Sequence, residues 1–222
     1  MNRLMKSFLD KNKMLKMLEF LYPPVGMWRA NFGLEKKIKK QEESYQQIFN
    51  EFVKNTTSKS YPNELFSEID KVEQGEIHRK EMLESKASSL LNTLGISITL
   101  IVLVPAILGK NWELPQCVAI VGASFFTLAV VHLLIAVYYA VKVTKVVSYY
   151  LKSADSVEDW IQNDPKKLVN LIAAEKFTNT KVNQPRLIIK SNCLIVAQAL
   201  FIRGIVFFGI GALVVLMYSI IG

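Results

Sequence analysis

Three long apolar runs dominate the second half of the chain. Residues 89–108 and 118–141 contain no charged side chain, and only His132 interrupts the second run. Residues 199–221 contain one charge, Arg203, and none of the runs contains Asp or Glu. A helix needs about 20 apolar residues to cross the hydrocarbon core, and lipid offers backbone polar groups no partners. The pattern therefore predicts an all-α integral membrane protein with about three transmembrane helices and a helical cytoplasmic region.

The runs predict four segments along the chain. They are a cytoplasmic helical region (1–88), a transmembrane hairpin (89–141), a cytoplasmic helical loop (142–198) and a third transmembrane helix (199–222). Lys and Arg number sixteen before residue 89, one in 109–116, nine in 142–198 and one, Arg203, beyond. Because cytoplasmic loops carry the excess of Lys and Arg, we expect a multi-pass inner-membrane protein with a cytoplasmic N-terminus and an external C-terminus.

The first 22 residues predict an amphipathic helix. Its apolar positions recur at helical spacing at Leu4, Phe8, Leu15, Leu18 and Tyr22, and Arg3 and four lysines supply charge elsewhere on the helix. The lysines expected at the lipid surface are Lys6, Lys11, Lys13 and Lys16. Such a helix can lie on an anionic membrane surface, or it can pack on the other cytoplasmic helices, and the sequence favours neither.

Prolines and glycines set the expected boundaries elsewhere in the cytoplasmic regions. Pro23 and Pro24 should end the first helix, and Gly26 and Gly33 should mark a turn before a polar helix at 34–54. A further helix is expected to start near Asn63 and to run unbroken into the first span. In the inner loop we expect short helices at 156–161 and 165–177, and then a helix after Pro185 that joins the third span.

Polar residues form one stripe on the first span. Steps of three and four place its members on one helix face: Ser85, Ser88, Asn92, Gly95 and Thr99. Such a stripe can pack against another helix or line a pore, and packing is the commoner use because small residues let helices approach closely. The candidate pore or helix-packing residues on this span are Ser88, Asn92 and Thr99.

The other two spans add three more candidates. Arg203 lies about 27 Å from the outer end of the third span, near the inner boundary, so its side chain can reach the headgroups. Gln198, further toward the cytoplasm, would then line an inner vestibule. His132 in the second span is expected to make an interhelical contact rather than to relay protons, because no second titratable group lies nearby in the runs.

Charge and cysteine content narrow the possible partners. The formal net charge is +8, and beside membrane spans the nearest anionic partner is lipid. We expect no contact with nucleic acid, because no base-reading motif accompanies the charge. Cys117 and Cys193 fall on opposite sides of the predicted membrane, which excludes a bond between them in one chain. No pattern predicts a metal, a cofactor or a catalytic residue.

Two short stretches at the entries to spans carry a family resemblance. Glu84-Ser85-Lys86-Ala87-Ser88-Ser89-Leu90-Leu91 precedes the first span, and Lys190-Ser191-Asn192-Cys193-Leu194, with Ala197, Phe201 and Gly204, precedes and enters the third. Over roughly residues 76–221 they make the chain similar to the membrane module of small bacterial antiphage effectors, especially the Pycsar transmembrane effectors. The resemblance implies an effector that assembles and impairs the inner membrane. The cyclic-nucleotide-sensing domain of that family is not recognisable in this sequence.

These observations predict a protein that is not an enzyme: a homo-oligomeric membrane protein that perturbs or permeabilises the inner membrane, as an antiphage effector or channel. The alternative is a membrane-anchored scaffold or sensor subunit that recruits a soluble cytoplasmic partner. A lipid-modifying enzyme and a transporter are disfavoured, since the sequence offers no nucleophile with a base and no internal repeat.

Overall fold

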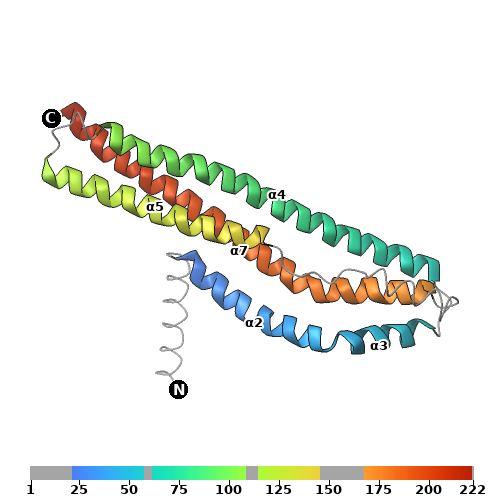
Figure 1. Cartoon of the computed structure of the whole chain (residues 1–222). Helices are drawn as coiled ribbons and strands as arrows, with labels where there is room; N and C mark the ends of the chain where they lie inside the picture. The colour runs from blue at the N-terminus through green and yellow to red at the C-terminus, as the bar shows by residue number, and fades with distance from the viewer. Residues whose placement is uncertain (1–21, 58–61, 109–114, 146–167, 222) are drawn as a thin grey trace, which may run out of the picture. The chain divides into compact units, whose positions relative to one another are not determined.

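The computed structural model describes residues 22–57, 62–108, 115–145 and 168–221 (Figure 1). The described residues are almost entirely helical and include no strand, which confirms the all-α prediction. The helices are α2 (Pro23–Glu43), α3 (Tyr45–Thr57), α4 (Pro62–Leu108), α5 (Gln116–Thr144) and α7 (Leu168–Ile221).

Three of the described helices, α4, α5 and α7, are long and apolar enough to cross a membrane. These are the helices that contain the three apolar runs, so the chain is a multi-pass membrane protein. α4 also confirms that one unbroken helix leads from the polar N-terminal half into the first span, because it begins at Pro62 and continues to Leu108.

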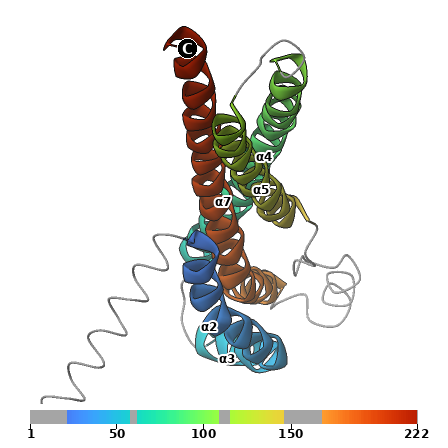
Figure 2. The ribbon, with the colours of Figure 1, turned by 90° about the vertical axis from the view of Figure 1, so that its left-hand side faces the viewer.

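Contacts divide the chain into two compact units, which we name the apolar unit (1–28, 84–145 and 192–222) and the polar unit (29–83 and 146–191). In the apolar unit α4, α5 and α7 lie side by side (Figures 1 and 2). Their shared core consists of Leu94, Ile101, Leu133, Ala136, Ala140, Val196, Ala197 and Leu200. The outward faces carry exposed apolar side chains such as Ile96, Ile120, Ile202 and Leu213, the composition that lipid contact requires.

Glycines on α7 and α5 allow these helices to approach closely. A Cβ atom on Gly204 would lie 2.7 Å from Leu133 Cδ2 and 3.2 Å from the backbone oxygen of Ala129. Gly122 on α5 faces Val215 in the same way, at 3.0 Å. Small residues at helix contacts are the usual device for packing in membranes, where helices gain little by hiding apolar surface from lipid.

The polar unit contains α3 and parts of α2, α4 and α7. Its part of α7 is buried on most sides: Leu171, Ala174, Val182 and Leu187 are all at most 8% exposed. The aromatic rings of Phe52 on α3 and Phe177 on α7 stack with centroids 4.8 Å apart.

The expected helix boundaries between residues 23 and 54 are wrong. Pro23 begins α2, and the helix continues through Gly26 and Gly33, the residues expected to form a turn. Proline is well tolerated in the first turn of a helix, where its missing N–H would have no intrahelical partner. The expected single helix over 34–54 is instead divided, since α2 ends at Glu43 and α3 starts at Tyr45.

The expected break before Pro185 is also wrong. α7 runs from Leu168 to Ile221 as one helix, with Pro185 inside it, so the short helix at 165–177 and the helix after Pro185 are one element. Proline removes one backbone hydrogen bond and usually kinks a helix. Here Pro185 is fully buried, and the packing around it offsets that loss. The helix expected at 156–161 lies outside the described residues.

Candidate functional site

The polar stripe of the first span lies on the exposed face of α4. Ser88, Asn92 and Thr99 are all exposed. The buried positions of this segment, Ala87, Leu94 and Ile101, recur every seven residues, and they face the core of the apolar unit. Because seven residues are two helical turns, the buried residues share one side of α4 and the stripe occupies the opposite side. Packing among the described helices therefore leaves the stripe uncovered.

Hydrogen bonding distinguishes the members of the stripe. Thr99 Oγ1 donates to the backbone oxygen of Gly95 at 2.9 Å, so its hydroxyl is satisfied within its own helix. The side-chain amide of Asn92 makes no hydrogen bond to any residue in the described parts of the chain. At Gly95 a Cβ atom would meet nothing within 4 Å. The stripe therefore offers open polar groups at Ser88 and Asn92 and room for a close neighbour.

His132 contacts the third span. Its Nδ1 lies 2.8 Å from the backbone oxygen of Leu128, one turn earlier in α5. The imidazole ring lies 4.9 Å from the ring of Phe207 on α7, centroid to centroid. These contacts give the half-buried ring a polar partner on its own helix and an apolar partner on α7.

The two remaining span candidates differ in burial. Gln198 is exposed, whereas Arg203 is half-buried and interacts with another group of the chain. Within the described residues no hydrogen bond joins Gln198 to Ser88, Asn92 or Thr99, so one chain alone does not assemble these candidates into a single site. The expected lipid-surface residues Lys6, Lys11, Lys13 and Lys16 lie outside the described residues.

The polar unit contains a feature that the sequence analysis missed. Polar side chains on one side of α7 are at least nine-tenths buried, and they recur at steps of three and four. They are Glu175, Asn179, Asn183, Arg186 and Lys190. The spacing is visible in the sequence, but polar residues at helical spacing ordinarily indicate a solvated face, and no apolar stripe marks the segment as core.

Partners from other helices satisfy several of these groups. Arg186 forms an ion pair with Glu42 of α2 and donates to Asn183 Oδ1 at 3.2 Å. The hydroxyl of Tyr45 donates to Asn179 Oδ1 at 2.8 Å. The Arg186–Glu42 pair is charge-assisted, whereas the Tyr45–Asn179 bond is neutral. Both are directional, so they fix which residues of α7 face α2 and α3.

Lys176 makes a second ionic contact in the same unit, with α4. It forms an ion pair with Asp70, and its Nζ lies 2.8 Å from Glu73 Oε2. Burial lowers the pKa of Lys176, but the hydrogen bonds to Asp70 and Glu73 outweigh burial, so the pKa lies above its ordinary value. Lys176 therefore stays charged at neutral pH and joins α7 to α4.

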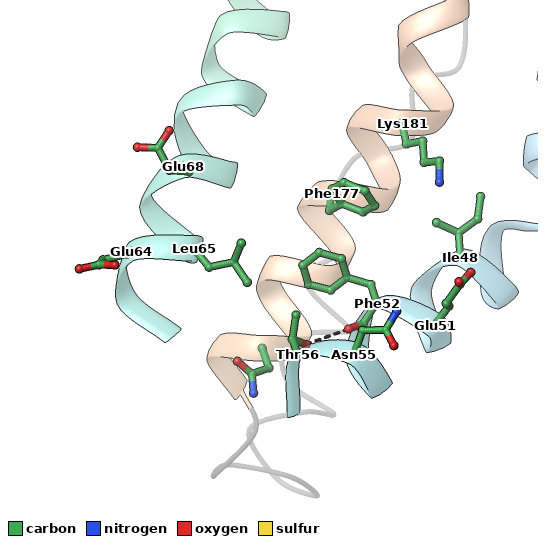
Figure 3. Close-up of a pocket in the computed structure, with 11 residues that line it drawn as sticks. Ile48, Glu51, Phe52, Asn55, Thr56, Glu64, Leu65, Glu68, Phe177 and Lys181 are labelled. Atoms are coloured by element: carbon green, nitrogen blue, oxygen red, sulfur yellow. Dashed lines mark hydrogen bonds between the residues drawn. The ribbon is translucent and has the colours of Figure 1, made fainter. Parts of the chain in front are cut away.

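A groove opens beside this network, between α3, α4 and α7 (Figure 3). Two adjoining hollows of about 650 and 470 Å³ share Phe52, Leu65, Glu68, Phe177 and Lys181 as lining residues. In Figure 3 Leu65 points toward the facing rings of Phe52 and Phe177, which makes the floor apolar. Phe177 and Leu65 are each 37% exposed, so the floor is open to solvent.

The rim of the groove is predominantly acidic. Glu64 and Glu68 line the groove from α4, but Figure 3 shows their carboxylates directed away from Phe52 and Phe177, and Glu68 pairs with Lys71 at 2.6 Å. Glu51 lines the groove from α3. Further along α4, Glu76 lines the groove with a buried Oε2 that has no hydrogen-bond partner in the described residues. Burial raises the pKa of Glu76, and the nearby Arg79 offsets this in part.

Neither a metal site nor a known relative accounts for these features. Among the described residues no group of three or more His, Cys, Asp or Glu side chains is placed to hold a metal ion. No protein-family model, no curated protein and no solved structure matches the chain.

Proposed function

We propose that this chain is an oligomeric inner-membrane protein that perturbs or permeabilises the membrane, as an antiphage effector or channel. The observation that carries the proposal is the uncovered polar stripe of α4, with the open amide of Asn92 and the exposed Ser88 and Thr99. Leaving one amide without a partner in an apolar medium costs about 1–3 kcal/mol. A copy of the same stripe on a neighbouring subunit, or a shared water-filled lumen, removes that cost.

The apolar unit supports assembly rather than a pore within one chain. Its α4, α5 and α7 pack on a continuous apolar core, and Gly122, Gly204 and Gly211 are already used in contacts between α5 and α7. Any water-filled path must therefore form between subunits, with α4 as the helix that presents polar groups. Arg203, if it faces such a lumen, would disfavour the entry of cations.

The proposal includes an orientation and a lipid partner. The placement of Lys and Arg supports a cytoplasmic N-terminus and an external C-terminus in the inner membrane. The net charge of +8 supports contact with anionic lipid. The antiphage role rests on the resemblance of the two span entries to Pycsar transmembrane effectors.

The test is to measure mass in lipid nanodiscs and conductance in liposomes for the parent protein and for Asn92→Leu. Thr93→Val is the matched control, because Thr93 Oγ1 already bonds to the backbone oxygen of Ser89 in its own helix at 3.0 Å. Loss of assembly in Asn92→Leu alone supports packing through the stripe, and loss of conductance with intact assembly supports lumen lining. A strictly monomeric parent protein in lipid would refute the proposal.

A second candidate function is a membrane-anchored scaffold that recruits a soluble cytoplasmic partner. The open groove of the polar unit favours it, since an apolar floor with charged rims is the usual form of a docking surface. The scaffold becomes the better hypothesis if liposomes that contain the assembled protein show no conductance.

A further inference from the structure

The groove between α3, α4 and α7 has the features of a site for an amphipathic helix. Its floor consists of the half-buried Phe52 and the exposed Leu65 and Phe177, and its rims carry Glu51 and Glu64. An amphipathic helix that lays its apolar stripe into such a groove places the residues flanking the stripe against the rims. Acidic rims therefore select a helix with basic flanks.

Length sets how much of a helix the groove can hold. Its lining residues on α4 extend from Glu64 to Glu76, which is twelve residue steps or about 18 Å. That is about three turns of a docked helix. Glu76 lies at one end of this 12-residue stretch, and its buried Oε2 has no hydrogen-bond partner among the described residues. A donor from a docked helix, most favourably a cationic one, would satisfy this oxygen.

This chain has one segment with the required chemistry, residues 1–22. The sequence predicts a helix there with Leu4 and Phe8 on its apolar stripe and with Arg3 and Lys6 off it, while Lys11 lies in line with the stripe. Two large apolar residues one turn apart suit the aromatic floor, and the basic residues suit the glutamates of the rims. The whole chain carries a formal net charge of +8, whereas the lining of this groove is predominantly acidic, so the groove attracts basic segments of the same protein.

Chain length argues that the occupant comes from another subunit. Residues 1–22 join α2 at Pro23, and as a helix they would be about 33 Å long. α2 has 21 residues and is therefore about as long. A helix that folded back along its own α2 would end near Glu43, before Ile48, the first lining residue of the groove. The N-terminal segment of a second copy is not restricted by the length of this α2.

We propose that the groove lined by Phe52, Leu65 and Phe177 binds the basic N-terminal segment of a second copy of this chain. The inference rests on the proposed oligomer and adds a cytoplasmic contact between its subunits. Anionic lipid competes for the same basic segment, so the strength of the contact depends on the lipid composition of the membrane.

The test is photo-crosslinking in the full-length protein. Benzoylphenylalanine replaces Phe8, and heavy- and light-isotope copies are mixed before reconstitution in phosphatidylethanolamine and phosphatidylglycerol. After irradiation, mass spectrometry should find heavy–light crosslinks from position 8 to the peptides that contain Phe52, Leu65 or Phe177. Crosslinks to lipid only, to the same copy only, or to a different surface would each overturn the inference.

Charge reversal on the rim supplies the control. Glu64→Lys together with Glu68→Lys should lower the yield of mixed crosslinks at least about fivefold, because two attractions become repulsions. Glu81→Lys changes another exposed glutamate of α4 that does not line the groove, and it should leave the yield unchanged. An equal effect of both changes would also overturn the inference.

Mass measurement separates the two proposals. An oligomer in nanodiscs without mixed crosslinks refutes the docking of the N-terminal segment and leaves the oligomer standing. A monomer without mixed crosslinks refutes both. The rim glutamates are exposed, so their substitution should not unfold the protein, and an unchanged melting temperature verifies this.

Discussion

Gly204 provides the sharpest test of how the membrane helices pack. A methyl group at this position would lie 2.7 Å from Leu133 Cδ2 and 2.8 Å from Leu133 Cγ. Leu133 is fully buried, and the backbone oxygen of Ala129, one turn earlier on the same helix, stands 3.2 Å from the added methyl group, so neither neighbour can move without displacing the core. Gly204→Ala should therefore destabilise the apolar unit, although alanine is the better helix former.

The size of the effect follows from overpacking. Extra methyl or methylene groups in a well-packed core cost about 1–3 kcal/mol. For a chain of this length each kcal/mol lowers the melting temperature by about 2–4 °C, so we expect a decrease of roughly 2–12 °C. Gly209→Ala is the matched control, because a Cβ atom there meets nothing within 4 Å. It should leave the melting temperature unchanged or raise it slightly.

The chain contains its own reporter of unfolding. Cys193 is 3% exposed, whereas Cys117 is exposed. In a Cys117→Ser background, a fluorogenic maleimide should react only when Cys193 becomes accessible, and a temperature ramp in detergent then gives the melting temperature.

Two outcomes would refute this account of the packing. If Gly204→Ala melts at or above the parent temperature, α5 and α7 do not approach as closely as the structure shows. If Gly204→Ala and Gly209→Ala lower the melting temperature equally, a methyl group on α7 is harmful wherever it is placed, and the contact with Leu133 is not the reason.

Further predictions concern the polar unit, the N-terminal segment and the topology. Glu42→Gln should lower stability by about 1.5–3 kcal/mol in the Cys193 assay, because the buried Arg186 loses its carboxylate partner but keeps its bond to Asn183, whereas the exposed Glu43→Gln should change little; equal effects would contradict this. The isolated 1–22 peptide should bind anionic vesicles less tightly by about 1 kcal/mol for each lysine neutralised, and equal binding to neutral vesicles would exclude the electrostatic contribution. The lysines to be neutralised are Lys6, Lys11, Lys13 and Lys16. An impermeant thiol reagent should label Cys117 from outside intact cells, and labelling only in inverted vesicles would reverse the topology.

The membrane-spanning part of the fold was predictable because its cause is local. An uncharged run of about 20 residues has one favourable state in lipid, whatever the rest of the chain does. The same holds for the long helix through Asn63, since nothing between that residue and the first span interrupts it. The face of the first span that remains uncovered could not be predicted, because that depends on which side α5 and α7 occupy.

The helix boundaries near prolines failed for a different reason. A proline ends a helix only when the loss of its backbone hydrogen bond is not offset by its position or by packing. Pro23 falls at the first position of α2, where no hydrogen bond is lost, and Pro185 is enclosed by packed side chains. For Pro23, the sequence alone allowed two positions, one after the end of a helix and one at the start of the next helix, and the second could have been considered. The case of Pro185 depends on tertiary packing, which propensity alone does not contain.

The buried polar side of α7 bears directly on what the polar unit does. A simple membrane anchor needs no fixed register in its cytoplasmic part, and burying charges such as those of Lys176 and Arg186 adds little net stability over apolar packing. What such pairs provide is a defined alignment of α7 against α2 and α4. A defined alignment is what keeps Phe177 facing Phe52 on the floor of the groove. The ionic network thus supports the proposed docking of an N-terminal segment from a second copy, because it holds the floor of the groove in a fixed arrangement.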